Sequence, residues 1–221
     1  MAIKIMLHTN VLDNIKKDGD KLREDLKEQG IILINVMASP GGGKTTTLVS
    51  LIQKMKEKHR IGVLEADLDS DVDAKKVSNL SGVEAIQIHT DTLCHIDSDM
   101  TREGIERFQD KSLDVIFLEN IGNMVCPADF DTGSHINICI LSIPEGNSKV
   151  YNYPRMYQHS DFVLINKMDA IDFFDFNLKE ATEFIQRQNP SVQVLPYSAK
   201  TLEGVEEIIR RLEEKIDYWR R

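Results

Sequence analysis

One short segment constrains this chain more than any other, because it joins an apolar run to a helix-like run through a glycine-rich turn. The apolar run covers residues 31–37, and the helix-like run covers Thr46–Lys58. The turn between them reads Ala38-Ser39-Pro40-Gly41-Gly42-Gly43-Lys44-Thr45. Glycines let backbone N–H groups turn inward around a phosphate, and the helix N-terminus adds its positive end. This order of strand, turn and helix predicts a phosphate-binding loop.

Two side chains at the end of the turn have the chemistry that such a loop needs. Lys44 would reach the outer phosphates, and the Thr45 hydroxyl would bind Mg²⁺. Ala38 takes the place of the usual opening glycine and is small enough for that position. The residues predicted to contact the nucleotide here are Pro40, Gly41, Gly42, Gly43, Lys44, Thr45 and Thr46.

Composition narrows the class of protein. A chain of 221 residues with 41% hydrophobic and 29% charged residues is typical of one globular unit with a sizeable core. Its net charge of −9 argues against nucleic-acid binding. No apolar run approaches membrane-spanning length, and the N-terminus lacks a signal-peptide pattern, so we expect a cytoplasmic protein without membrane contact. Three cysteines without CxxC spacing indicate reduced thiols.

Apolar runs alternate with helical patterns along most of the chain. The predicted strands are Ile31–Met37, Ile61–Glu65, Glu84–Ile88, Leu113–Leu118, Ile136–Leu141, Phe162–Ile165 and Val192–Leu195. The predicted helices are Thr45–Lys58, Asp71–Leu80, Ser98–Phe108, Leu178–Gln188 and Leu202–Trp219. This alternation predicts an α/β protein with the P-loop NTPase fold, a mostly parallel sheet with helices on both faces. Ligands of such sheets bind beyond the carboxyl ends of the strands.

The first thirty residues follow a different pattern. Val11, Ile15, Leu22 and Leu26 lie near helical spacing among charged residues, and Gly30 would close that helix. We therefore expect an N-terminal helical extension over residues 1–30, followed by a P-loop domain over residues 31–221, which the next motif identifies as a GTPase domain.

A second motif predicts which base is bound. Asn166-Lys167-Met168-Asp169 follows the predicted strand Phe162–Ile165 and fits the guanine-specificity pattern Asn-Lys-x-Asp. Asp169 would accept hydrogen bonds from the guanine N1–H and the exocyclic amine, which adenine cannot offer. Lys167 would lie along the base plane, and Asn166 would tie this loop to the phosphate loop. The loop after the next strand, Ser198-Ala199-Lys200, would contact guanine O6.

Magnesium requires hard oxygen ligands near the outer phosphates. Thr45 supplies one, and the acidic candidates are Asp67, Asp73 and Glu119. Asp67 and Glu119 each come directly after a predicted strand and are favoured, with Asp73 close behind. We assign the catalytic apparatus to Lys44, Thr45, Asp67 and Glu119. Asp71 is expected to cap the helix that follows it.

Sulfur and imidazole side chains gather in two loops that leave the same edge of the sheet. Cys94-His95 lies in one loop and Cys126-Pro127 in the other. Two thiolates and an imidazole suit Ni²⁺ or Zn²⁺, but a four-coordinate site would then need water or a second subunit. Taken alone, residues of this kind are more often isolated buried or exposed side chains than metal ligands. Cys139, within a strand-like run, is interpreted as a core residue. The histidines other than His95 receive no role.

The segment that contains Cys126 resembles a known family signature. It reads Glu119-Asn120-Ile121-Gly122-Asn123-Met124-Val125-Cys126-Pro127-Ala128-Asp129-Phe130-Asp131 and is similar to that of the hydrogenase nickel-incorporation GTPases, the HypB family. Further resemblance lies in Cys94-His95-Ile96-Asp97, Pro144-Glu145-Gly146 and Asn166-Lys167-Met168-Asp169.

The resemblance implies a dimeric GTPase that delivers nickel to [NiFe]-hydrogenase. Its implied partners are GTP, the nickel-binding protein HypA and the precursor of the hydrogenase large subunit. It also implies a metal site between subunits, formed by Cys94, His95 and Cys126. Ala66 departs from the family's usual Gly-Asp start, and the surrounding segment is unusually acidic. This sequence has neither the N-terminal cysteine-rich nickel motif nor the histidine-rich tract of some members, so we expect no nickel storage.

Three alternatives remain open at this stage. The urease nickel-insertion GTPase UreG resembles this chain but has its ligands in one short Cys-Pro-His motif, whereas here they are separate. A regulatory GTPase without a metal role would bind a partner through its switch segments. An ATP-dependent kinase would share the phosphate loop but not Asn166-Lys167-Met168-Asp169. Arg102 and Arg155 are candidate transition-state cations or merely solvated side chains.

Overall fold

The centre of the molecule is a seven-stranded sheet with the order β3-β2-β4-β1-β5-β6-β7. The computed structural model describes residues 18–67, 72–90 and 93–221. Every neighbouring pair of strands in this sheet is parallel. The strands are β1 (Ile32–Ala38), β2 (Ile61–Asp67), β3 (Glu84–His89), β4 (Val115–Glu119), β5 (Ile136–Ser142), β6 (Phe162–Asn166) and β7 (Gln193–Pro196). The predicted α/β class and parallel sheet are confirmed.

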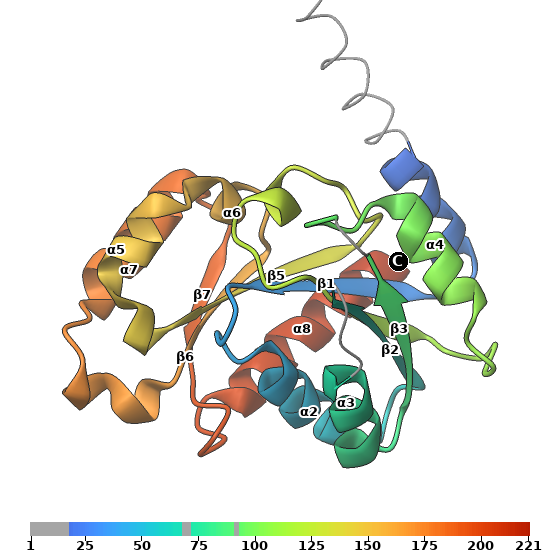
Figure 1. The fold of residues 1–221 in the computed structure, drawn as a ribbon, viewed down its shortest axis with the longest axis horizontal. Coiled ribbons are helices and arrows are strands. Elements are labelled where there is room, and N and C mark those ends of the chain that lie inside the picture. Colours follow the sequence, from blue (N-terminus) through green and yellow to red (C-terminus); the bar gives the residue numbers. More distant parts are fainter. Residues whose placement is uncertain (1–17, 68–71, 91–92) are drawn as a thin grey trace, which may run out of the picture.

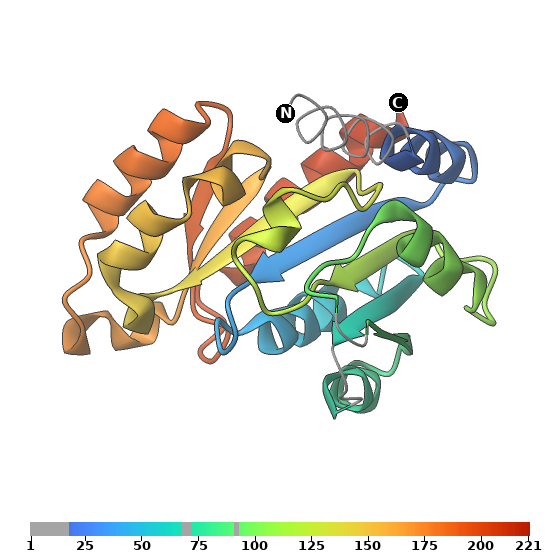
Figure 2. The same cartoon turned by 45° about the horizontal axis from the view of Figure 1, so that its top comes forward.

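Helices cover both faces of the sheet (Figures 1 and 2). One face packs against α2 (Lys44–Met55), α3 (Val72–Ser81) and α8 (Val205–Arg220). The other carries the helix over residues 18–28, α4 (Ser98–Glu106), α5 (Gly146–Asn152), α6 (Pro154–Gln158) and α7 (Leu178–Gln188). Successive residues of β1 alternate between these layers: Ile32 and Ile34 face the first, and Leu33 faces the second. Burial on both faces explains the continuous apolar strands.

The helix over residues 18–28 packs onto the domain core. Leu22 and Leu26 are each 2% exposed and lie in the same core cluster as Leu33. The Arg23 guanidinium lies 2.8 Å from a carboxylate oxygen of Asp131, so a charged contact supplements the apolar one. Gly30, with φ of 75°, turns the chain from this helix into the sheet. The predicted positions Val11 and Ile15 lie outside the described residues.

Most strands extend further than their apolar runs. Asp67, Glu119 and Asn166 are the last residues of β2, β4 and β6, whereas the sequence placed each of them in the following loop. The parallel ladder explains the difference, because Asp67 pairs with His89 and Glu119 pairs with Val36. The backbone at these positions is therefore held by the sheet, and the polar side chains stand on rigid supports.

Helix ends differ from the prediction for local reasons. Helix α8 begins at Val205 rather than Leu202, because Leu202 and Gly204 both have positive φ, 66° and 79°. The short helices α5 and α6 were not predicted, since neither is long enough to show a clear period. Asp71, the expected cap of α3, lies outside the described residues. No helix in the described ranges is long and apolar enough to cross a membrane.

Candidate functional site

A cavity of about 560 Å³ lies at the carboxyl ends of the central strands. Its volume is within the range of small-molecule sites. Its lining includes the predicted residues Pro40, Gly41, Gly43, Lys44, Thr45, Thr46, Asp67, Asp73, Glu119 and Lys167. The sequence did not single out Lys76, Ile121 and Gly122, which also line it. The phosphate-loop and magnesium candidates therefore meet in one place.

The glycine-rich turn has the backbone of an anion-binding loop. Gly41 and Gly43 have φ of 74° and 97°, which side chains disfavour, and α2 begins directly after Gly43. A Cβ atom at Gly42 would lie 3.2 Å from the Ser39 carbonyl oxygen, so the turn is tight. The Ser39 hydroxyl donates to the Glu145 carboxylate, which joins the turn to the segment after β5. The N-terminus of α2 therefore opens into the cavity.

Asn166 connects the guanine-type motif to two other loops. Its side-chain amide donates to the Gly42 carbonyl over 3.2 Å, and its Oδ1 accepts from the Ala199 backbone over 3.1 Å. The Lys167 ammonium donates to the Gly41 carbonyl at 2.9 Å. Asn166 is only 2% exposed, so the two bonds that its side chain makes are shielded from water. The base loop and the phosphate loop are thus fixed relative to each other.

The Asp169 carboxylate is held in its ionised form. The Ser198 hydroxyl donates to its Oδ1 over 2.6 Å, and this bond is the main cause that lowers the pKa of Asp169. The Lys200 ammonium lies 3.6 Å from Oδ2 and acts in the same direction. Asp169 therefore presents an anionic acceptor beside the loop that contains Ser198, as recognition of two N–H donors requires.

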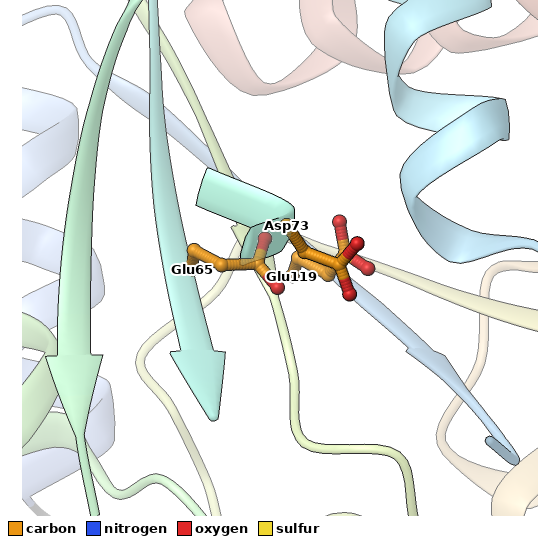
Figure 3. A group of neighbouring side chains, drawn as sticks. All are labelled: Glu65, Asp73 and Glu119. Atoms are coloured by element: carbon orange, nitrogen blue, oxygen red, sulfur yellow. The ribbon is translucent and has the colours of Figure 1, made fainter. Parts of the chain in front are cut away.

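Three carboxylates, Glu65, Asp73 and Glu119, meet at one place (Figure 3), and Asp73 and Glu119 line the cavity. Glu65 comes from β2, Glu119 from the end of β4 and Asp73 from the start of α3. Oxygen atoms from all three lie within 4.8 Å of one another. The Thr45 hydroxyl donates to Glu119 over 2.9 Å. Asp67 lines the same cavity but is outside this group.

The donor set fits a hard divalent cation. One oxygen of Glu65 and one of Glu119 are buried with no hydrogen-bond partner. Burial is the main cause that raises the pKa of both carboxyl groups, and mutual repulsion adds to the effect at Glu65, whose pKa rises to about 11. A bound Mg²⁺ would satisfy the unpaired Glu119 oxygen and offset the repulsion among the carboxylates. Thr45, Glu119 and Asp73 are the side chains that the geometry favours as ligands.

Glu65 is the site residue that the sequence missed. It was placed at the end of a predicted strand and given no role. A charged residue in an otherwise apolar strand was the available signal, because glutamate is almost never fully buried without a partner. Glu65 is 2% exposed.

The two predicted thiols lie side by side. The Cys94 and Cys126 sulfur atoms are 2.6 Å apart, and the hydrogen bond between them is the main cause that raises the pKa of Cys126. Cys94 is exposed, and the apolar residues beside the two cysteines, Leu93 and Val125, are 44% and 56% exposed. The pair is therefore accessible at the surface. Cys139 is fully buried in the core, as predicted.

His95 is near this pair in sequence but is not joined to it. Its ring stacks on Phe130 with ring centroids 3.4 Å apart. The carboxylates above form the one three-residue group of metal-ligating type among the described residues, so no nitrogen of His95 completes a compact site with both thiols. Arg102 and Arg155 pair with Asp25 and Asp129, each at 2.9 Å, and neither arginine is among the described residues that line the cavity.

Comparison with known proteins places the chain in a family. The family model described as "CobW/HypB/UreG, nucleotide-binding domain" matches residues 32–196. The hydrogenase maturation factor HypB of Rhizobium leguminosarum bv. viciae is 37% identical over 95% of this chain and 70% of its own length. The hydrogenase/urease maturation factor HypB of Helicobacter hepaticus is 34% identical over 96% of this chain and 88% of its own length.

A solved structure has a similar fold. It is that of HypB from Helicobacter pylori in complex with nickel, which matches with a TM-score of 0.86 and 32% identity. The match covers 93% of this chain and 96% of that one. Sequence and fold comparisons thus agree, and the chain belongs to the HypB family of hydrogenase maturation factors within the CobW/HypB/UreG group.

Proposed function

We propose that this chain hydrolyses GTP and, as a homodimer, assists nickel insertion during maturation of [NiFe]-hydrogenase. The observation that carries the proposal is a short covalent connection between the two candidate sites. Glu119 lies at the floor of the nucleotide cavity, and the segment that follows it leads to Cys126. A Cβ atom at Gly122 would lie 3.2 Å from the Pro40 ring, so this segment runs against the phosphate loop. A change at the outer phosphate can therefore reach the thiols directly.

The base loop supports guanine as the recognised base. The ionised Asp169 would accept from the N1–H and the exocyclic amine of guanine, while Asn166 keeps this loop at a fixed distance from the phosphate loop. Adenine would leave the carboxylate without a donor, which costs more than the roughly 1–3 kcal/mol typical of an unsatisfied neutral group. GTP is thus the substrate that best fits this part of the cavity.

The residues around the expected position of the outer phosphates favour slow hydrolysis. Lys44 would neutralise charge at the outer phosphates as the bond to the leaving phosphate breaks. Thr45, Glu119 and Asp73 would hold Mg²⁺, which supplies further neutralisation of the phosphate oxygens when bound. The described residues that line the cavity include no arginine, so we expect a low intrinsic rate.

The thiol pair supports a metal site shared between two copies. One chain offers two sulfur ligands, and a second copy would complete a four-coordinate set. Leu93 and Val125 flank these ligands and are exposed in the single chain, so pairing of two chains would bury them. Nickel is the favoured cargo because the Helicobacter pylori relative was solved with it, and Zn²⁺ suits the same ligands.

The partner, the recipient and the location are inferred from membership of the family. We propose HypA as the nickel-binding partner, the hydrogenase large subunit precursor as the recipient, and the cytoplasm as the location. A second recipient is also supported, because the Helicobacter hepaticus relative is named as a hydrogenase/urease maturation factor. Nickel delivery to urease is therefore the second candidate function.

Two measurements on the wild-type protein test the proposal. Phosphate release is measured with GTP and with ATP, and Ni²⁺ and Zn²⁺ binding is measured by equilibrium dialysis. We expect hydrolysis of GTP in strong preference to ATP, and binding of both metals under reducing conditions. Hydrolysis without metal binding would support a regulatory GTPase instead. Equal use of ATP and GTP would contradict the base assignment.

A further inference from the structure

We propose that Phe130 holds the His95 imidazole outside the Cys94–Cys126 thiol pair, and that it thereby tunes which cations the pair accepts. The inference rests on the proposed metal site, and it assigns Phe130 as a positioning residue for one ligand of that site. Cations that bind through thiolates alone would be unaffected by Phe130. Cations that recruit the imidazole would first have to separate the two rings.

The stack between the two rings is the first observation. The ring planes of His95 and Phe130 are inclined by only 13°, and their centroids are 3.4 Å apart. Aromatic pairs in such contact attract each other beyond the burial of their area. The imidazole is therefore held by a specific partner, although its two neighbours in the proposed site, Cys94 and Cys126, lie close by in the chain or in space.

The position of Phe130 is itself fixed on both sides. The preceding Asp129 is paired with Arg155 at 2.9 Å, and the following Asp131 accepts two bonds from Arg23, at 2.8 and 2.9 Å. Gly133 donates its backbone N–H to Asp131 over 2.8 Å. Because both flanking carboxylates are anchored, the aromatic ring between them has a defined place for His95 to pack on.

The loop that carries His95 is anchored as well. Asp97 caps α4 by accepting from the Met100 backbone over 2.9 Å, and Ile96 is fully buried. The backbone next to His95 therefore has little freedom, and a move of the imidazole toward the sulfurs must come mainly from rotation of its side chain. Such a rotation breaks the stack.

The consequence differs between cations. Zn²⁺ favours four ligands drawn from sulfur and nitrogen, so it gains from the imidazole. Cu⁺ is satisfied by soft thiolates. Removal of the Phe130 ring should therefore strengthen Zn²⁺ binding by about two- to tenfold, the range that one aromatic pair spans. Cu⁺ binding should stay unchanged.

A double-mutant cycle tests this. Zn²⁺ affinity is measured by competition with a chelator for the wild type, Phe130→Leu, His95→Ala and the double variant. We expect Phe130→Leu to bind Zn²⁺ more tightly than the wild type, and to have no effect in the His95→Ala background. Phe130→Tyr keeps the ring and should bind like the wild type. Weaker binding by Phe130→Leu, or an equal change in both backgrounds, would overturn the proposal.

A spectroscopic readout separates the stack from the metal site. In the metal-free protein, the ring protons of His95 should be shifted upfield by Phe130, and this shift should persist in Phe130→Tyr and disappear in Phe130→Leu. Absence of the shift in the wild type would contradict the stack itself. If the shift is present but Cys94→Ala and Cys126→Ala bind Zn²⁺ like the wild type, the proposed metal site fails and the tuning of cations by Phe130 fails with it.

Discussion

The nucleotide cavity and the thiol pair differ in how much of each site one chain provides. Around the cavity, Asn166 and Glu119 are 2% and 1% exposed, and hydrogen bonds within the chain join three separate loops. At the other site, two sulfur atoms meet at the surface between exposed apolar residues, and the nearby imidazole packs elsewhere.

This difference predicts which of the two binding events, nucleotide or metal binding, depends on a second copy of the chain. A preorganised cavity needs little further ordering, so nucleotide binding should proceed in a single chain. The thiol pair offers too few ligands for a closed site, so tight metal binding should depend on association of two chains. Variants in the two regions should then fail in different ways.

The largest expected effect lies in the phosphate loop. Lys44→Ala removes the cation beside the outer phosphates, and we expect GTP hydrolysis to fall by about 10²–10³-fold. Metal binding in the absence of nucleotide should persist. Phosphate release is the measurement, with Lys58→Ala, an exposed lysine beyond the end of α2, as the matched control. Hydrolysis at the wild-type rate would contradict the assignment of the loop.

A change of base preference should follow from Asp169→Asn. An amide N–H can meet the carbonyl that xanthine carries at C2, whereas the lost carboxylate no longer pairs with the guanine amine. We expect GDP to bind about a hundredfold more weakly, as for the loss of charged hydrogen bonds, and XDP to bind more tightly. Dissociation constants for both nucleotides decide the matter. Asp172→Asn, an exposed position in the 3₁₀ helix Met168–Phe173 that also contains Asp169, should change neither.

At the surface site, Cys94→Ala and Cys126→Ala should each weaken Ni²⁺ and Zn²⁺ binding by roughly 10–100-fold, as for the loss of a metal-site interaction. Nucleotide affinity should stay within a few-fold of the wild type. The hydrogen bond that the Cys126 thiol donates to Cys94 raises the pKa of Cys126, and this thiol must release its proton on ligation. Metal affinity should therefore fall as the pH drops from 8 to 6. Dialysis at both pH values tests this. Metal binding by both variants at the wild-type level would contradict the assignment of the two thiols as ligands.

A smaller effect concerns the stability of the folded protein in the absence of metal. The folded-state pKa of Glu65 is raised to about 11, whereas the unfolded value is near 4.5. The folded protein thus binds a proton more tightly, and stability should fall as the pH rises through this window. Glu65→Gln mimics the protonated acid and should raise the free energy of unfolding at pH 8 by about 1–3 kcal/mol. Urea unfolding at pH 6 and pH 8, without metal, measures this. A larger stabilisation by Glu65→Gln at pH 6 than at pH 8 would contradict the raised pKa of Glu65.

Much of the fold was predictable from local pattern. The parallel sheet follows from apolar runs alternating with amphipathic segments, and helix α7 was predicted with its observed ends, Leu178 and Gln188. Strand ends were harder, because a polar residue such as Glu119 interrupts the apolar pattern while the backbone ladder continues. Burial of Glu65 was not predicted, because a charged side chain normally indicates exposure and its place in an apolar strand was the only contrary signal.

The candidate site was predictable where a motif specifies backbone geometry. Gly41 and Gly43 have the positive φ that the turn requires, and the motif from Asn166 to Asp169 lies beside that turn. The placement of His95 was not predictable, because its stack with Phe130 joins loops that are far apart in the sequence. Tertiary contacts of this kind leave no periodic signal in a single chain.

The central claim is that the nucleotide and the metal communicate through the segment between Glu119 and Cys126. The most direct test is Ni²⁺ titration of the protein loaded with GDP or with a non-hydrolysable GTP analogue, with sedimentation of each sample. We predict that the γ-phosphate changes both metal affinity and dimerisation, and that metal changes affinity for the analogue relative to GDP by the same factor. Metal affinity and dimerisation that are identical in the two nucleotide states would contradict the claim.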